Sequence, residues 1–217
     1  MKLLLTSGGL TNKSISSALF DLVGKKPEDT SLVFIPTASN IEMGDKDWLI
    51  NDLINIRNQN FKSVAVTDIS AVEESIWRPQ MEEADVLFFG GGNTYHLMRW
   101  INKSGLVKIL PELLKTKVYV GLSAGSMVTG PDLALRMSQI IYGEDLEEEF
   151  MDGLNFVDFY LLPHLHSPYF PERQEENAQK LSKEILRKIY FLDDQSAIKV
   201  LNGKTEIITE GKYLEFN

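Results

Sequence analysis

Ser123 lies in a Gly-x-Ser-x-Gly pattern that runs from Gly121 to Gly125 and follows the apolar stretch Val118–Val120. A strand that ends in a sharp turn around a serine, with a helix after it, is the arrangement of a nucleophile elbow. Only small neighbours fit beside the strained serine backbone of such a turn, and both glycines and Ala124 are small. The following helix would point its amino terminus at an oxyanion beside the serine. The pattern therefore makes Ser123 a candidate nucleophile.

A serine nucleophile needs a base, and the chain has three histidines, His96, His164 and His166. His164 follows Pro163, whose ring fixes the backbone just before the imidazole. His166 lies two residues further on and would share a face with His164 in an extended chain. His96 falls in a segment expected to be helical, where a packing or surface role is the ordinary interpretation. The spacing alone leaves His164 and His166 as alternative bases.

The base in turn needs an acid that orients it. Asp194 comes just after the apolar segment Tyr190–Leu192, where a strand would end. Because ligand sites in α/β sheets gather at the carboxyl ends of the strands, we expect Asp194 to reach the same edge of a single sheet as Ser123. Its competitors in the sequence are Asp132, Glu144, Asp145 and Asp193.

Acyl transfer also requires two N–H donors for the developing oxyanion. The amide of Ala124, the residue after the serine, is one donor in a nucleophile elbow. Gly91 or Gly92 would supply the second, because only glycine lets the backbone approach a substrate so closely. The alternative interpretation is a phosphate-binding loop, but no Lys-Ser/Thr pair follows these glycines and the pattern is not Gly-x-Gly-x-x-Gly.

The composition limits the classes of protein that fit. The 217 residues are 43% hydrophobic and 24% charged, which is ordinary for a globular protein. The chain has no cysteine, which excludes disulfides, thiolate metal sites and a cysteine nucleophile. A net charge of −9 argues against binding to nucleic acid, and no apolar run approaches the roughly 20 residues of a membrane span. The apolar run Leu3–Leu5 is too short for a signal peptide, so we expect a cytoplasmic protein.

The elements that must position these side chains alternate between strands and helices. The predicted strands are Leu3–Thr6, Ser31–Ile35, Ser63–Val66, Asp85–Phe89 and Lys117–Gly121. The predicted helices are Ser14–Val23, Trp48–Ile56, Glu73–Glu83 (as helix or loop) and a segment that begins after Asn93 or Thr94. This alternation predicts an α/β fold with a doubly wound, mostly parallel sheet and helices on both faces.

The pattern changes after Ser123. The acidic run Glu144–Glu149 is expected to be a solvated surface, Phe156–Leu162 is predicted as a strand, and Glu172–Ile189 is predicted as an amphipathic helix. Short β segments follow at Ala197–Leu201, Thr205–Thr209 and Lys212–Phe216, with a hairpin turn at Asn202-Gly203. Because no linker or repeat separates these segments, residues 1–217 are expected to form one domain.

Several motifs in this order and spacing resemble a known family. They are Leu32-Val33-Phe34-Ile35-Pro36-Thr37-Ala38-Ser39, Phe89-Gly90-Gly91-Gly92-Asn93-Thr94, Gly121-Leu122-Ser123-Ala124-Gly125 and Pro163-His164. Together they are similar to the aspartyl dipeptidase (dipeptidase E) and cyanophycinase family of serine peptidases, peptidase family S51. The resemblance covers roughly residues 1 to 200. It implies a sheet like that of class I glutamine amidotransferases, with serine where those enzymes use cysteine.

The resemblance also implies roles for individual residues. Ser123 would be the nucleophile and His164 the base, since the family's catalytic histidine directly follows a proline. Gly92 and Ala124 would be the backbone donors to the oxyanion. An acid after the strand that follows the long helix would be Asp194, where dipeptidase E has a glutamate. An acid between the serine and the histidine has also been proposed in the family, and Glu144 or Asp145 would be nearest to that position here.

The substrate implied by the resemblance is a small peptide with an N-terminal aspartate or a β-aspartyl linkage. An acidic substrate on a chain of charge −9 needs a local cation, for which Arg173 is the first candidate and Arg136 the second. Asn93 is also expected to contact the substrate, and no metal or organic cofactor is expected. The segment from His166 to Tyr169 does not copy dipeptidase E, so we expect the pocket to differ.

The predicted function is that of a serine exopeptidase acting on dipeptides or small peptides through an acyl-enzyme. One alternative is an esterase of the α/β-hydrolase type, but such an enzyme normally has its histidine near the carboxyl terminus, and here more than fifty residues follow His166. The other is a non-catalytic small-molecule binding protein on the same fold. Exposed aromatic side chains at Tyr169 and Phe170 would suit a contact between two copies, so a homodimer is a further hypothesis.

Overall fold

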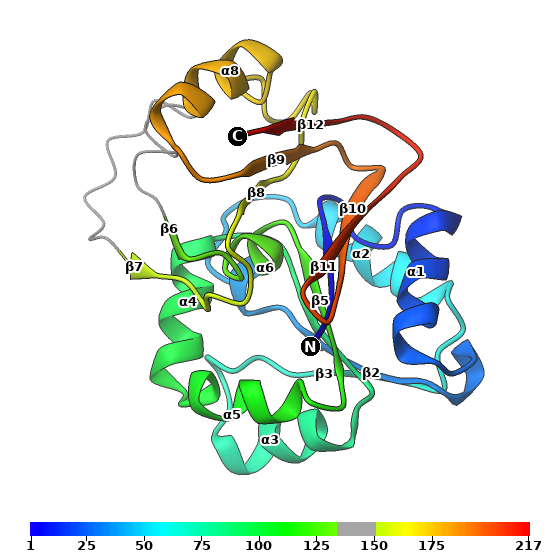
Figure 1. The fold of residues 1–217 in the computed structure, drawn as a ribbon. Coiled ribbons are helices and arrows are strands. Elements are labelled where there is room, and N and C mark those ends of the chain that lie inside the picture. Colours follow the sequence, from blue (N-terminus) through cyan, green and yellow to red (C-terminus); the bar gives the residue numbers. More distant parts are fainter. Residues whose placement is uncertain (134–150) are drawn as a thin grey trace.

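The computed structural model describes residues 1–133 and 151–217, and its largest element is a seven-stranded sheet (Figure 1). The strand order is β11-β10-β1-β5-β4-β2-β3. Five strands are parallel: β1 (Lys2–Thr6), β2 (Ser31–Ile35), β3 (Ser63–Val66), β4 (Val86–Phe89) and β5 (Val118–Leu122). The strands β10 (Ser196–Leu201) and β11 (Lys204–Thr209) extend the sheet in antiparallel fashion. The predicted mostly parallel sheet is confirmed.

Helices cover both faces of this sheet, because the side chains of the central strands alternate between two apolar clusters. In β1, Leu3 and Leu5 belong to one cluster and Leu4 to the other. The face of Leu4 is covered by α1 (Lys13–Val23) and α2 (Asp47–Arg57). The face of Leu3 and Leu5 is covered by α3 (Glu74–Glu83), α4 (Thr94–Lys103) and α5 (Leu106–Leu113). The predicted doubly wound arrangement is thus confirmed.

A separate three-stranded sheet of order β12-β9-β8 lies with α8 at one end of the molecule (Figure 1). Its strands are β8 (Tyr160–Leu162), β9 (Ile189–Leu192) and β12 (Tyr213–Phe216), and α8 spans Glu175–Glu184. One face of this small sheet, with Leu161 and Leu192, packs into the larger core cluster. The other face, with Leu162 and Phe191, packs against Leu181 of α8. The strands β8 and β9 are apolar throughout because both of their faces are buried, whereas the edge strand β12 contains Glu215 and is more exposed.

The remaining described elements are short. They are the helix α6 (Ala124–Met127), the 3₁₀ turns η1 (Pro27–Asp29) and η2 (Thr37–Ser39), and the paired strands β6 (Asp132–Leu133) and β7 (Met151–Asp152). Arg136, Glu144, Asp145 and the acidic run Glu144–Glu149 lie outside the described residues. Among the helices of the described residues, none has the length and apolarity needed to cross a membrane.

Three predictions that involve the carboxyl-terminal half are wrong. The helix predicted over Glu172–Ile189 ends at Glu184, because Ile185 adopts extended backbone (φ −112°, ψ 115°) and Ile189 begins β9. The helical spacing of apolar residues continued to Ile189 only because this residue is fully buried in a strand. The strand predicted over Phe156–Leu162 is limited to β8. Since β8 and β9 belong to the small sheet, Ser123, His164 and Asp194 follow strands of two sheets and not of the single sheet expected.

Candidate active site

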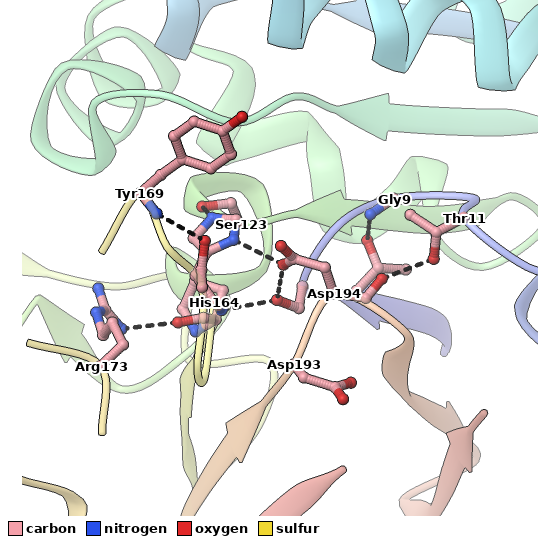
Figure 2. Close-up of polar contacts among 12 residues, drawn as sticks. Gly9, Thr11, Ser123, His164, Tyr169, Arg173, Asp193 and Asp194 are labelled. Carbon is pink, nitrogen blue, oxygen red and sulfur yellow. Dashed lines mark hydrogen bonds and ion pairs between the residues drawn. The ribbon is translucent and has the colours of Figure 1, made fainter. Parts of the chain in front are cut away.

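Ser123 occupies the sharp turn between β5 and α6 (Figure 2). Its backbone has φ 49° and ψ −107°, which is strained for a residue with a side chain. The Ser123 amide donates to the carbonyl of Thr6 on the neighbouring strand β1, at 3.1 Å. The strand, turn and helix expected around this serine are therefore present, and the turn is tied to the centre of the large sheet.

The glycines of the turn are required by close backbone approach. A Cβ at Gly121 would lie 2.6 Å from the backbone of Gly125, and one at Gly125 would lie 2.1 Å from the carbonyl oxygen of Phe89. The buried hydroxyl of Tyr119 donates to the Gly125 carbonyl at 2.6 Å and holds the turn against β5. Side chains larger than hydrogen at either glycine would displace Ser123.

A chain of hydrogen bonds joins Ser123 to His164 and Asp194 (Figure 2). The Ser123 Oγ lies 2.9 Å from His164 Nε2, and His164 Nδ1 lies 2.7 Å from Asp194 Oδ1. The imidazole is 15% exposed and the carboxylate side chain 43% exposed. With Nδ1 protonated and donating to the carboxylate, Nε2 is left as an acceptor for the serine hydroxyl proton.

The backbone and ring of His164 are held from three sides. His164 has a positive φ of 67°, and its amide donates to the hydroxyl of Ser7 at 2.8 Å. The ring of Phe170 stacks on the imidazole, with centroids 4.6 Å apart and planes 10° apart. The buried Arg173 donates from Nη1 to the carbonyl of Pro163 at 3.1 Å. These contacts fix the imidazole above Ser123.

The other two histidines lie elsewhere. His166 has φ 61° and places its Nε2 3.5 Å from the carboxylate of Glu175 at the start of α8. His96 lies on α4, where burial lowers the pKa of its imidazole, as does the nearby Arg99, against the opposing charge of Asp68. The structure thus separates the two alternatives that the spacing left open, because only His164 meets the serine.

Asp194 follows β9 and is held by the loop after β1. Burial alone would raise the pKa of its carboxyl group, but hydrogen bonds from His164 and Ser7 outweigh burial and lower the pKa below its ordinary value. The Thr11 hydroxyl donates to the Asp194 carbonyl at 2.7 Å, and a Cβ at Gly8 would lie 2.9 Å from the Asp194 Cβ. Asp194 is therefore an ionised acceptor in a fixed position at neutral pH.

The two predicted oxyanion donors are amides beside the serine. Ala124 is the first residue of α6, so its N–H has no acceptor within the helix. Gly92 has φ 125°, and a Cβ there would lie 2.3 Å from the Ala38 carbonyl. A Cβ at Gly91 would lie 3.4 Å from the Ser123 Cβ, so the glycine loop runs alongside the serine. Within residues 1–133 and 151–217, no backbone hydrogen bond occupies the amides of Gly92 or Ala124.

The two predicted substrate-binding residues that the structure describes, Arg173 and Asn93, have other contacts. Arg173 is only 1% exposed and supports the Pro163 carbonyl, so the expectation that its guanidinium meets an acidic substrate disagrees with its position. Sequence reasoning missed this because arginine is seldom buried. Asn93 caps α4 by accepting from the His96 amide at 2.8 Å, which commits its side-chain oxygen. The side-chain nitrogen Nδ2 of Asn93 is left to donate to a substrate.

Of the competing acids, Asp132 and Asp193 are in the described part of the chain, and both make other contacts. Asp132 accepts from the Tyr160 hydroxyl at 2.7 Å, and Asp193 accepts from the Ser196 hydroxyl at 2.6 Å. Ser7 is the residue of the site that the sequence did not single out, because a serine after a strand looks like any turn serine. Over the described ranges, no three His, Asp or Glu side chains are grouped so as to hold a metal ion.

Residues 3–208 match the family model of peptidase family S51. An uncharacterized peptidase of Pasteurella multocida is 26% identical over 186 residues, which are 83% of this chain and 86% of that protein. A peptidase E of Shewanella oneidensis is 36% identical over 106 residues, which are 48% of this chain and 43% of that protein.

Two solved structures share the fold. A crystal structure from Listeria monocytogenes, described as a "Putative Peptidase E Protein", superposes with a TM-score of 0.77 at 25% identity and covers 97% of this chain and 98% of its own. A peptidase from an acI-B1 Actinobacterium superposes with a TM-score of 0.67 at 17% identity, covering 98% of this chain and 88% of its own. The second likeness concerns the fold alone.

Proposed function

Since the chain belongs to peptidase family S51 and is a serine-type peptidase, we propose that it hydrolyses a peptide bond of dipeptides or small peptides with Ser123, His164 and Asp194. The observation that carries this proposal is the continuous set of hydrogen bonds from the Ser123 hydroxyl through the imidazole to the Asp194 carboxylate. A nucleophile, a base in reach of it and a third group that orients the base are the parts that such a reaction needs.

In the first half of the reaction, Ser123 Oγ attacks the carbonyl carbon of the peptide bond while His164 Nε2 takes the hydroxyl proton. The imidazolium that forms is stabilised by Asp194, to which Nδ1 donates. The carbonyl oxygen becomes negatively charged and accepts from the amides of Gly92 and Ala124. Loss of one such donor typically costs about 3 kcal/mol of transition-state stabilisation.

In the second half, the bond between carbon and nitrogen breaks and His164 gives its proton to the leaving amine. A water molecule then enters, His164 takes one of its protons, and the hydroxide adds to the acyl-enzyme. The bond to Ser123 Oγ breaks as the serine regains a proton. The released products are an acid and an amine, and the residues return to their starting protonation states.

The substrate class proposed is a small peptide with an N-terminal aspartate or a β-aspartyl linkage. Relatives named peptidase E support a peptide as the substrate. The cation that such a substrate needs is not Arg173, because that side chain is buried behind Pro163. Arg136 lies outside the described residues and is the remaining candidate. The Asn93 amide nitrogen is proposed as a donor to the substrate.

A fluorophosphonate probe tests the nucleophile. We expect mass spectrometry to find the phosphonyl group on Ser123 in the wild type, no labelling in Ser123→Ala and labelling slowed at least about 100-fold in His164→Ala. His166→Ala is the matched control, because that imidazole faces Glu175 rather than Ser123, and it should react at the wild-type rate. Labelling at Ser126, or none at all in the wild type, would overturn the assignment.

A substrate panel tests the reaction. Dipeptides of the type Asp-X, β-aspartyl dipeptides, neutral dipeptides, N-acetylated peptides and simple aryl esters are compared by their kcat/KM. We expect free dipeptides to be cleaved and N-acetylated ones to be poor substrates. Turnover of esters alone would instead identify an esterase, and labelling without turnover of any peptide would contradict the peptidase assignment for these substrates.

A further inference from the structure

Ser7 is a fully buried serine that contacts both His164 and Asp194. It directly follows β1, and its hydroxyl donates to Asp194 Oδ1 at 2.8 Å. The same hydroxyl oxygen accepts from the backbone amide of His164 at 2.8 Å. Its donor and its acceptor capacity are thus both directed at the base and the acid.

The position of Ser7 in the large sheet links it to the nucleophile as well. In the parallel pairing of β1 with β5, Thr6 is opposite Leu122, so Ser7 and Ser123 are the next residues of the two strands. The carbonyl of Thr6 accepts from the Ser123 amide at 3.1 Å and from the Ser126 hydroxyl at 2.8 Å. Two consecutive residues therefore hold the serine turn on one side and the histidine and aspartate on the other.

This link matters because the catalytic groups come from different sheets. Ser123 follows β5 of the seven-stranded sheet, whereas His164 and Asp194 follow β8 and β9 of the small sheet. A small displacement between the sheets would lengthen the 2.9 Å contact between Ser123 Oγ and His164 Nε2. A misplacement of about 1 Å at reacting groups can cost 100-fold in rate.

We propose that Ser7 is a positioning residue of this active site, which acts by holding His164 and Asp194 over Ser123. The proposal depends on the proposed function. Because the side chain of Ser7 has no exposed surface, it does not meet the substrate and its effect passes through the two residues that it binds. Its loss should therefore lower the rate of the chemical step and leave binding unchanged.

The experiment measures phosphonylation by a fluorophosphonate at several probe concentrations, which separates the maximal rate constant kinact from the half-saturation constant KI. For Ser7→Ala we expect kinact to fall between about 10- and 100-fold and KI to stay within about twofold of the wild type. Thr30→Val is the matched control, because it removes another fully buried hydroxyl, which donates to the Lys26 carbonyl just before β2, at the opposite edge of the sheet. This control should keep the wild-type kinact.

A double-mutant cycle separates positioning from a general structural role. In an Asp194→Ala background, Ser7→Ala should lower kinact by less than about threefold further, because residues that act through one another are not additive. A loss as large as that in the wild-type background, a wild-type kinact in Ser7→Ala, or a changed KI with unchanged kinact would each overturn the proposal.

Circular dichroism checks that each variant is folded. If Ser7→Ala does not fold, Ser7→Cys tests the same point, because the thiol is similar in size but a weak donor, and the chain has no other cysteine. Its kinact should lie below the wild-type value, and equality with the wild type would overturn the proposal. Failure of the wild type to react at Ser123 would instead refute the proposed function, so the two failures are distinguishable.

Discussion

Two residues of the site carry side chains at backbone angles that favour glycine. Ser123 has φ 49° and His164 has φ 67°, and such conformations typically cost about 1–3 kcal/mol each. The surroundings maintain them: the Thr6 carbonyl binds the Ser123 amide, and the Ser7 hydroxyl binds the His164 amide. The geometry of the proposed nucleophile and base is therefore set in the folded protein before any substrate arrives.

At Gly92, the addition of a single methyl group should lower activity while the protein still folds. Its φ of 125° and the 2.3 Å from an added Cβ to the Ala38 carbonyl mean that Gly92→Ala must displace the loop. The proposed oxyanion donor is thereby moved, so we expect phosphonylation of Ser123 to slow by about 100-fold. The rate is measured by mass spectrometry, together with the free energy of unfolding in urea.

The control for that variant is Gly105→Ala. Gly105 also has a positive φ, 82°, but an added Cβ there would meet nothing within 4 Å. The substitution should cost about 1–2 kcal/mol of stability from the left-handed backbone and leave the rate unchanged. An equal loss of rate in both variants would contradict a specific role for the Gly92 loop.

The sequence nominated the candidate catalytic residues but not the residues that hold them in place. Residue types and order nominated Ser123 but left His166 as an alternative to His164, and other acids as alternatives to Asp194. The resemblance to peptidase family S51 was needed to favour His164 and Asp194. The roles themselves stay predictions until the probe experiment is done. Ser7 and Arg173 have no such signature, since their functions come from burial and from contacts between segments distant in sequence.

At the scale of elements, α8 and β9 show why the spacing of apolar residues predicts that a helix exists but not where it ends. The amphipathic pattern of α8 was real, with Ala178 and Leu181 buried on one face. It appeared to continue because Ile185 packs against the same cluster and Ile189 is buried in β9. A residue buried by a strand and one buried by a helix look alike in sequence, so the end of a helix is fixed only by the backbone contacts that follow it.

Helix α2 contains a carboxyl group that should make stability depend on pH. Burial, with a smaller contribution from the charge of Asp194, raises the pKa of Asp52 from 3.8 to about 7. The folded protein thus keeps a proton that the unfolded chain releases above pH 3.8, so stability falls as pH rises through the window from about 4 to 7. Each pKa unit corresponds to about 1.4 kcal/mol, which places the full penalty at pH 8 on the order of 4 kcal/mol.

Asp52→Asn removes this penalty because the amide cannot ionise. We expect the variant to be more stable than the wild type at pH 8 and about equally stable at pH 4, as measured by urea denaturation at both pH values. Asp47→Asn, at an exposed position in the first turn of the same helix, should not make the protein more stable than the wild type at pH 8, because the helix dipole favours a carboxylate there. A pH-independent effect of Asp52→Asn would mean that Asp52 is ionised in the folded protein throughout this range.

At the scale of the whole molecule, the active site bridges two sheets that the sequence suggested were one. The first five strands were predictable because apolar runs alternate with helical stretches and lead to parallel pairing. Which strands pair after Tyr160 depends on contacts between distant segments, such as β8 with β9 and β12 with β9. Local patterns do not encode such pairing, and the separation of the small sheet was therefore not predictable.

This architecture predicts that activity is lost before the large sheet unfolds. The outer face of the small sheet is covered mainly by α8, in the smallest apolar cluster of the described residues, and elements with little buried apolar area open most easily. The three tryptophans, Trp48, Trp77 and Trp100, lie on α2, α3 and α4 around the large sheet. Their fluorescence therefore follows that sheet, whereas phosphonylation of Ser123 needs both sheets.

The two signals are compared across one urea titration. We expect the phosphonylation rate to fall at a lower urea concentration than the change in tryptophan fluorescence, because opening of the small sheet removes His164 and Asp194 from Ser123. Hydrogen exchange should then be faster in β8, β9 and α8 than in β1, β4 and β5. Coincident transitions with uniform exchange protection would mean that the contacts of Ser7 and the shared core join the two sheets into one cooperative unit.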